Sequence, residues 1–177
     1  MKNKTNMLFI RRLLFAFLIV VTASFQSTKG FVPQIKDVSA FVLIPLVVCI
    51  ALFEKSVPSL FFGAFAGIMW DMYSVTAEGF FSVLLTATGF FTAIIILFYM
   101  RNNIVTAVIL TFLSALFCNT LYWFNFILMA DNTAAVYIYS RYYLPSAFYT
   151  AIFTFIFYFA VKLIYEKTSP ERKRINY

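Results

Sequence analysis

The sequence predicts an all-α integral membrane protein: a bundle of about six transmembrane helices, with five as the alternative. Its composition is 63% hydrophobic and only 12% charged, whereas soluble domains average about 45–50% apolar and 25% charged residues. Its mean hydropathy is +0.88. Each crossing needs about 20 mostly apolar residues. The 177 residues therefore predict a single transmembrane domain, 1–177, with no room for a soluble domain.

Turns rich in charge, proline or glycine separate the apolar segments. The predicted spans are 13–27, 38–53, 59–73, 80–100, 104–129 and 142–165. The second and third are short for full crossings, so a re-entrant pair is the alternative. Pro45 is expected to kink the second span, because proline removes a backbone donor. Pro145 is expected near the first turn of the last span, where a missing N–H has no cost.

The first apolar segment has two interpretations. Residues 1–23 imitate a secretory signal, with a basic start, an apolar run and a candidate cleavage site at Val21-Thr22-Ala23. The alternative is a retained first helix. Retention is favoured because the rest of the chain is multispanning and the distribution of Lys and Arg fits a topology that keeps this helix.

Lys and Arg predict the orientation. With six crossings, 11 of the 14 basic residues lie on the side that holds both termini, which predicts a multi-pass protein of the bacterial inner membrane with both termini cytoplasmic. The predicted cytoplasmic segments are short and basic, 1–12 at the N-terminus and 166–177 at the C-terminus. The net charge of +7 then follows from topology and does not indicate nucleic acid. The basic run 171–174 is expected to contact anionic lipid headgroups, with docking of a partner as the alternative.

Residue types that support soluble chemistry are scarce. There is no His, and Cys49 and Cys118 lie inside apolar spans without further ligands, so no metal, cofactor or disulfide is predicted. No phosphate-binding loop or nucleophile elbow occurs. Asp71 and Glu78 are interpreted as capping and hydrating a turn, with catalysis as the alternative. A lipid-modifying enzyme would need clustered acids or His at one membrane face, so the chain is predicted not to be an enzyme.

The most informative stretch is the glycine-spaced segment that ends in Asp71. On a helix, Gly63, Ala64, Gly67 and Asp71 share one arc. The opposite side carries bulky apolar residues: Phe61, Phe62, Phe65, Ile68, Met69 and Met72. Small residues let two helix backbones approach closely, and an intramembrane acid is costly unless it faces protein, water or the interface. Asp71 is expected to orient the outer turn by hydrogen bonding or to contact a partner.

A second small-residue face lies in the fourth predicted span. Its members recur at spacings of 3, 4, 3 and 4: Gly79, Ser82, Thr86, Gly89 and Ala93. This spacing places them on one side of a helix. We expect this face to pack against Gly63 and Gly67.

The fifth predicted span carries a mildly polar stripe. Its members are Thr111, Ser114, Cys118, Tyr122 and Asn125. The stripe could line a ligand cavity or form interhelical hydrogen bonds, which are worth about 0.6 kcal/mol each. The second interpretation is favoured, because the stripe has no charge to hold a polar substrate.

Tyrosines cluster just before the last predicted span. They are Tyr137, Tyr139, Tyr142 and Tyr143. Their place at the predicted outer interface is typical of an aromatic belt. Anchoring to the membrane is the favoured interpretation, and a binding surface is the alternative.

The chain resembles the family of the bacterial rod shape-determining protein MreD. The resemblance rests on the glycine-rich helix, Asp and flanking glycines: Gly63, Gly67, Asp71, Gly79 and Gly89. Pro33 after the first span and Pro145 at the start of the last also match. The turn 74–78 departs from the family pattern, because it lacks a second glycine and a proline.

The resemblance implies a non-enzymatic scaffold of the peptidoglycan-synthesising elongation machinery, with a role in cell shape. The implied partners are the lipid bilayer, an MreC-type periplasmic protein, a SEDS glycosyltransferase and its transpeptidase. The family is similar in fold to the substrate-binding S components of energy-coupling-factor transporters, which supplies the alternative function of vitamin or micronutrient uptake. Such components carry small residues on the first helix, where this chain has only Ala16, Ala23 and Ser24.

Overall fold

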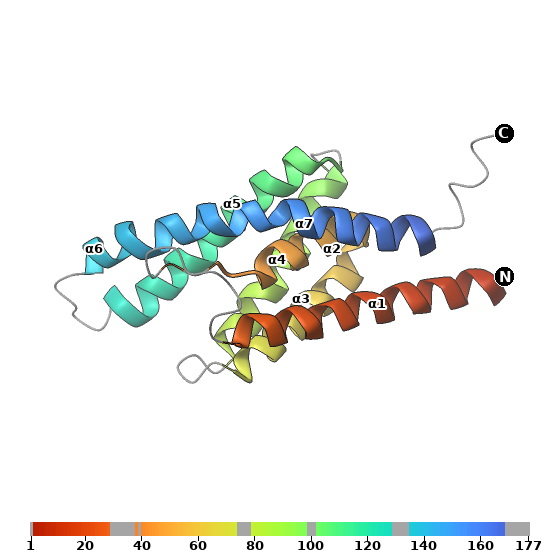
Figure 1. Cartoon of the computed structure of the whole chain (residues 1–177), viewed down its shortest axis with the longest axis horizontal. Helices are drawn as coiled ribbons and strands as arrows, with labels where there is room; N and C mark the ends of the chain where they lie inside the picture. Colours follow the sequence, from red (N-terminus) through yellow and green to blue (C-terminus); the bar gives the residue numbers. More distant parts are fainter. Residues whose placement is uncertain are drawn as a thin grey trace.

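The computed structural model describes residues 2–28, 38, 40–73, 79–98, 102–128 and 135–168, and this part of the chain contains helices and no β-strand. The helices are α1 (Lys2–Ser27), α2 (Leu43–Phe53), α3 (Ser56–Asp71), α4 (Phe80–Phe98), α5 (Ile104–Trp123), α6 (Ala135–Ile138) and α7 (Leu144–Thr168) (Figure 1). Two π-helical stretches extend them: η1 (Phe124–Leu128) follows α5, and η2 (Tyr139–Tyr143) joins α6 to α7.

Within the described ranges, four helical segments are long and apolar enough to cross a membrane. They are Asn6–Ser27, Phe80–Phe98, Ile104–Ile127 and Ala135–Thr168. Large apolar side chains are exposed on these segments, as for Phe9, Val83 and Phe155. The expectation of an all-α bundle suited to a membrane is confirmed, while the count of six crossings stays a prediction.

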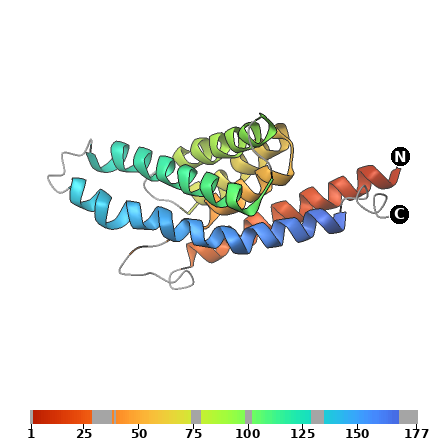
Figure 2. The ribbon, with the colours of Figure 1, turned by 90° about the horizontal axis from the view of Figure 1, so that it is seen from above.

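Contacts between helix ends define two ends of the molecule. At the basic end, Arg11 of α1 meets Glu54, which follows α2, and Tyr165 of α7. At the aromatic end, Phe81 of α4 stacks on Tyr122 of α5. The first turns of α1 and the last turns of α7 lie at the same end (Figures 1 and 2). Successive long elements therefore run in alternating directions.

Helix α2 forms the centre of the core. All of its residues except Phe53 are buried, and it contacts α1, α3, α4, α5 and α7. The expectation of a span over 38–53 was wrong at its start, because the helix begins at Leu43. Its 11 residues cover only about 17 Å, against a hydrocarbon core of about 30 Å. Pro45 consequently lies in the first turn of α2 and does not kink a longer helix.

Two side chains from other helices hold the non-helical backbone ahead of α2. The Phe41 N–H donates to Thr150 Oγ1 at 3.0 Å, and the Leu43 N–H donates to Gln26 Oε1 at 3.0 Å. Irregular backbone at membrane depth is tolerated where protein satisfies its polar groups. Thr150 and Gln26 supply these acceptors, so the chain can enter the bundle and begin α2 inside it.

Pro145 lies within a continuous helical segment, so the expectation of a helix start there was wrong. The segment begins ten residues earlier, at Ala135, and the π-helical turns of η2 directly precede α7. Proline leaves a carbonyl one turn back without its N–H partner and crowds it. We attribute the wider turns to this proline. Asn119 Nδ2 donates to the Tyr143 carbonyl at 3.0 Å, which satisfies an acceptor at this irregularity.

Candidate functional site

The glycines of α3 and α4 allow backbone-to-backbone contact between the two helices, which form the most extensive helix pair among the described residues. A Cβ atom added at Gly63 would overlap the Leu85 carbonyl oxygen, and one at Gly67 would overlap Ser82 Cα. At Gly89 it would lie 2.6 Å from the Ser59 carbonyl oxygen. The structure therefore brings Gly63, Gly67 and Gly89 together in one contact, which only residues without a side chain can form.

Asp71 caps the first turn of α4. Its Oδ1 accepts the Phe81 N–H at 3.2 Å, and its Oδ2 accepts the Ser82 N–H at 2.8 Å and the Ser82 hydroxyl. The first N–H groups of a helix lack intrahelical partners, and a negative charge there is favourable. Both carboxylate oxygens are thus used within the hairpin. Asp71 is a positioning residue that joins the end of α3 to the start of α4.

Gly79 serves the turn and not the helix contact, so its place in the packing stripe of the fourth span was wrong. Its φ is +78°, and a Cβ atom added there would meet nothing within 4 Å. This φ is accessible to glycine at little cost. Glu78, the other acid of this turn, lies outside the described residues.

The bulky side of α3 is divided between core and surface. Phe62 and Phe65 pack against the core, and the rings of Phe62 and Phe15 are 5.9 Å apart in a T-shaped contact. Phe61 and Ile68 are exposed, at 66% and 49%. The sequence pattern predicted one small face and one bulky face. The structure differs because α1 also lies against α3, so this helix has protein neighbours on two sides.

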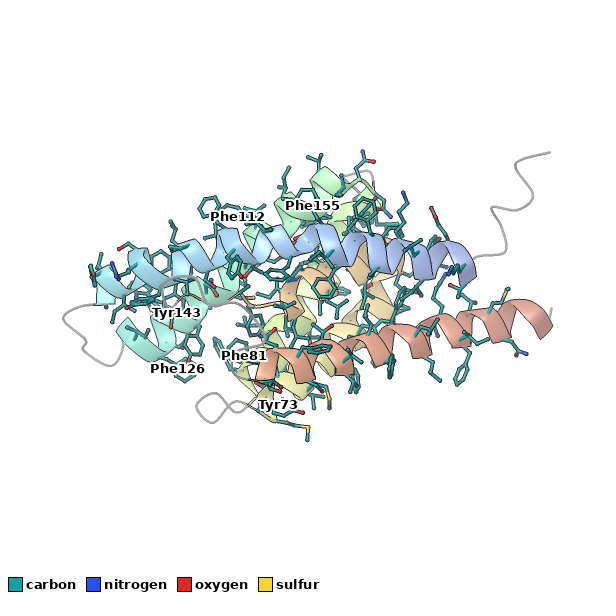
Figure 3. All side chains as sticks on the ribbon, viewed as in Figure 1. Tyr73, Phe81, Phe112, Phe126, Tyr143 and Phe155 are labelled. Atoms are coloured by element: carbon teal, nitrogen blue, oxygen red, sulfur yellow. The ribbon has the colours of Figure 1, made fainter. Side chains whose placement is uncertain are left out.

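Aromatic rings fill the space between the α3–α4 hairpin and α5. Phe81 stacks on Phe41 at 5.2 Å and on Tyr122 at 5.6 Å between ring centroids. Trp70 meets Phe41 edge-on at 5.0 Å. Tyr143, labelled with Phe81 in Figure 3, also lies near the aromatic end, and its ring centroid is 6.1 Å from that of Tyr122. Such pairs contribute about 0.5–1.5 kcal/mol each beyond area burial.

The polar stripe of α5 is only partly engaged with other helices. Cys118 Sγ lies 3.7 Å from Thr88 Oγ1 of α4. Asn125 Nδ2 donates to the Leu121 carbonyl of its own helix at 2.9 Å. Thr111 is fully buried and its hydroxyl has no hydrogen-bond partner. Cys118 thus makes the expected contact with another helix, whereas the Thr111 hydroxyl is buried without a hydrogen-bond partner.

A buried ion pair at the basic end was missed by the sequence reasoning. Arg11 Nε lies 2.6 Å from Glu54 Oε1, and the residues are 7% and 9% exposed. The Arg11 guanidinium lies 5.0 Å from the Tyr165 ring centroid. Arg11 was assigned to a short basic segment, 1–12, but α1 already begins at Lys2. The available signal was a lone acid between two apolar segments, because such a group needs a partner.

The helices and their apolar surfaces define a multi-pass helical membrane protein with a glycine-packed hairpin. No group of three His, Cys, Asp or Glu residues that could hold a metal occurs among the described residues. Comparison of the chain with protein-family models, with curated proteins and with solved structures found no match.

Asp71→Ala is expected to lower the free energy of unfolding by about 1–2 kcal/mol, because α4 loses its N-terminal cap. Asp71→Asn should cost less, since an amide oxygen still accepts one N–H. Thermal unfolding of the purified chain in detergent measures both changes. Met72→Ala, at a neighbouring side chain that is 73% exposed, is the control. An Asp71→Ala loss equal to the control would contradict the cap.

Proposed function

We propose that this chain is a non-enzymatic scaffold subunit of the bacterial cell-wall elongation machinery that takes part in determining cell shape. The observation that supports the proposal is the architecture of the stretch that resembles the MreD family. Gly63, Gly67 and Gly89 lie in backbone contact, Gly79 forms the turn, and Asp71 caps α4. Each of these five residues therefore has a structural task, and the Asp71 carboxylate is engaged within the hairpin. A rigid membrane-embedded hairpin suits a protein that positions partners.

The proposed setting is the inner membrane with both termini in the cytoplasm. The proposed partners are an MreC-type periplasmic protein, a SEDS glycosyltransferase and its transpeptidase. The outer face of the hairpin offers exposed apolar side chains for contacts within the membrane, among them Phe61, Ile68 and Phe91. Because α3 and α4 are fixed to each other, these side chains keep a constant spacing.

Depletion of the protein in a rod-shaped host should round or swell the cells, and expression of the intact chain should restore rods. Cell shape by microscopy and co-purification of the MreC-type protein measure this role. Phe61→Ala tests the hairpin face and should lower the amount of co-purified partner. Phe17→Ala of α1 is the matched control, because Phe17 is 64% exposed and Phe61 is 66% exposed. Unchanged cell shape on depletion, together with no co-purified partner, would contradict the scaffold.

A second candidate is a vitamin-binding subunit similar to a transporter S component. The observation that favours it is the pair of fully buried hydroxyls without partners, Thr111 on α5 and Thr154 on α7. Buried polar groups usually bind protein or water, so these hydroxyls have capacity for a polar ligand or a water molecule. Uptake of a vitamin with an energy-coupling module, with cell shape unaffected by depletion, would favour this function.

A further inference from the structure

The hairpin of α5–η1 and α6–η2–α7 extends past the α3–α4 turn at the aromatic end (Figure 2). Phe81, at the start of α4, stacks on Tyr122 of α5. Residues 123–128 and the facing residues 135–143 continue from this level toward the far end of the hairpin, with the Phe126 ring still 5.4 Å from that of Phe80. We call these two ranges the hairpin tip.

Specific contacts hold the two arms of the hairpin tip together. Trp123 Nε1 donates to the Ala135 carbonyl at 2.8 Å, and Tyr139 Oη lies 2.9 Å from Thr120 Oγ1. The rings of Trp123 and Tyr139 are 5.1 Å apart. Each arm includes one π-helical stretch, η1 or η2. Such turns are rare overall, and those that occur are often found at functional sites. The tip is thus an ordered structure that can present side chains in a defined arrangement.

The length of the last helical segment places the hairpin tip at the height of lipid headgroups. Ala135–Thr168 has 34 residues, which cover about 51 Å in helical geometry, well beyond the hydrocarbon core of about 30 Å. Arg141 and Lys162 are 21 positions apart in this segment, a separation of about 31 Å. When Lys162 lies at one membrane surface, Arg141 lies at the other.

Arg141 is an exposed cation in an aromatic and apolar setting. Its guanidinium lies 5.9 Å from the Tyr137 ring centroid and 6.0 Å from that of Tyr142. No acidic side chain pairs with it within the described ranges. Val136 and Leu144, nearby on the same segment, are 75% and 41% exposed. Among the described residues, this positive charge therefore has no acidic partner, is flanked by tyrosines and has apolar side chains close by.

We propose that the hairpin tip binds the phosphate of an anionic lipid headgroup through Arg141. The planar guanidinium donates to two phosphate oxygens at once. Tyr137 and Tyr142 keep it oriented, and tyrosine is enriched at membrane interfaces. Leu144, which lies three residues nearer the membrane centre than Arg141 and is 41% exposed, contacts the upper acyl chain. A free phosphate lacks this chain, so the occupant is a lipid. This site does not depend on the proposed role in cell-wall synthesis.

The test compares the full chain in vesicles of phosphatidylglycerol and of phosphatidylcholine. We expect a higher midpoint of thermal unfolding in phosphatidylglycerol, and Arg141→Gln should remove at least half of that rise. Arg141→Lys, which keeps the charge and loses the planar fork, should fall between the two. Arg12→Gln, at an exposed arginine of α1, is the matched control and should keep most of the rise. Inorganic phosphate added to the phosphatidylcholine sample should not raise the midpoint.

Three results would overturn the proposal. The first is an undiminished rise in Arg141→Gln. The second is an equal loss in Arg12→Gln, which would indicate a response to net charge alone. The third is a rise produced by inorganic phosphate as large as that of phosphatidylglycerol, which would indicate a free anion as the occupant. Retention of phosphatidylglycerol in native mass spectrometry gives a readout that does not depend on unfolding.

Discussion

Arg11→Leu is expected to lower the free energy of unfolding by about 3–5 kcal/mol, because it leaves the Glu54 carboxylate buried without its countercharge. Arg11 and Glu54 are 7% and 9% exposed, with 2.6 Å between Arg11 Nε and Glu54 Oε1. Glu54 also follows the C-terminus of α2, where the helix dipole disfavours an acid. Chemical unfolding in detergent micelles, followed by circular dichroism, measures the loss.

The double variant Arg11→Leu/Glu54→Leu separates the stability lost by leaving one charge unpaired from the effect of having leucine at these two positions. It should recover much of the stability lost in the single variant, since replacing both partners of a buried pair by apolar residues is often neutral. Arg12→Leu removes the adjacent exposed arginine and should change stability by less than about 0.5 kcal/mol. If Arg11→Leu costs no more than Arg12→Leu, the ion pair does not hold α1 to the core.

Gly67→Leu is expected to destabilise the chain by about 3 kcal/mol, at the upper end of overpacking effects. A Cβ atom at Gly67 overlaps Ser82 Cα and lies 2.7 Å from the Phe81 carbonyl oxygen. Backbone atoms cannot rotate away as a side chain can, so α3 and α4 must separate. The separation also moves Ser82 away from the Asp71 carboxylate that caps α4. The yield of folded protein and its unfolding midpoint measure the effect.

Ile68→Leu is the matched control, one position along the same helix. This side chain is 49% exposed, and the substitution keeps its size, so stability should change by less than about 0.5 kcal/mol. Gly89→Leu, which faces α3 from the other helix, should behave like Gly67→Leu. Equal tolerance of Gly67→Leu and Ile68→Leu would show that the glycine face contacts no backbone.

Local periodicity predicted the parts of the fold that depend on near neighbours. The predicted spans 59–73 and 80–100 agree with α3 and α4 to within three residues at both ends, and the predicted start at residue 104 agrees with that of α5. The contact of Gly63 and Gly67 with α4 could be anticipated, because small residues at helical spacing mark where two helices meet. Asp71 was expected to orient the turn, since an acid beside a helix start finds unpaired N–H groups within reach. Composition alone determined the membrane class.

Tertiary contacts decided the rest, because the groups concerned are satisfied by residues far away in the sequence. Leu43 can begin α2 inside the bundle only because Gln26 and Thr150 accept the backbone N–H groups there. Arg11 and Glu54 form a pair only when α1 lies beside the end of α2. The sequence by itself therefore determined which helices form and which faces can meet. The folded chain decided how deep each helix begins and which buried polar groups are paired, since an unpaired group in an apolar interior is costly.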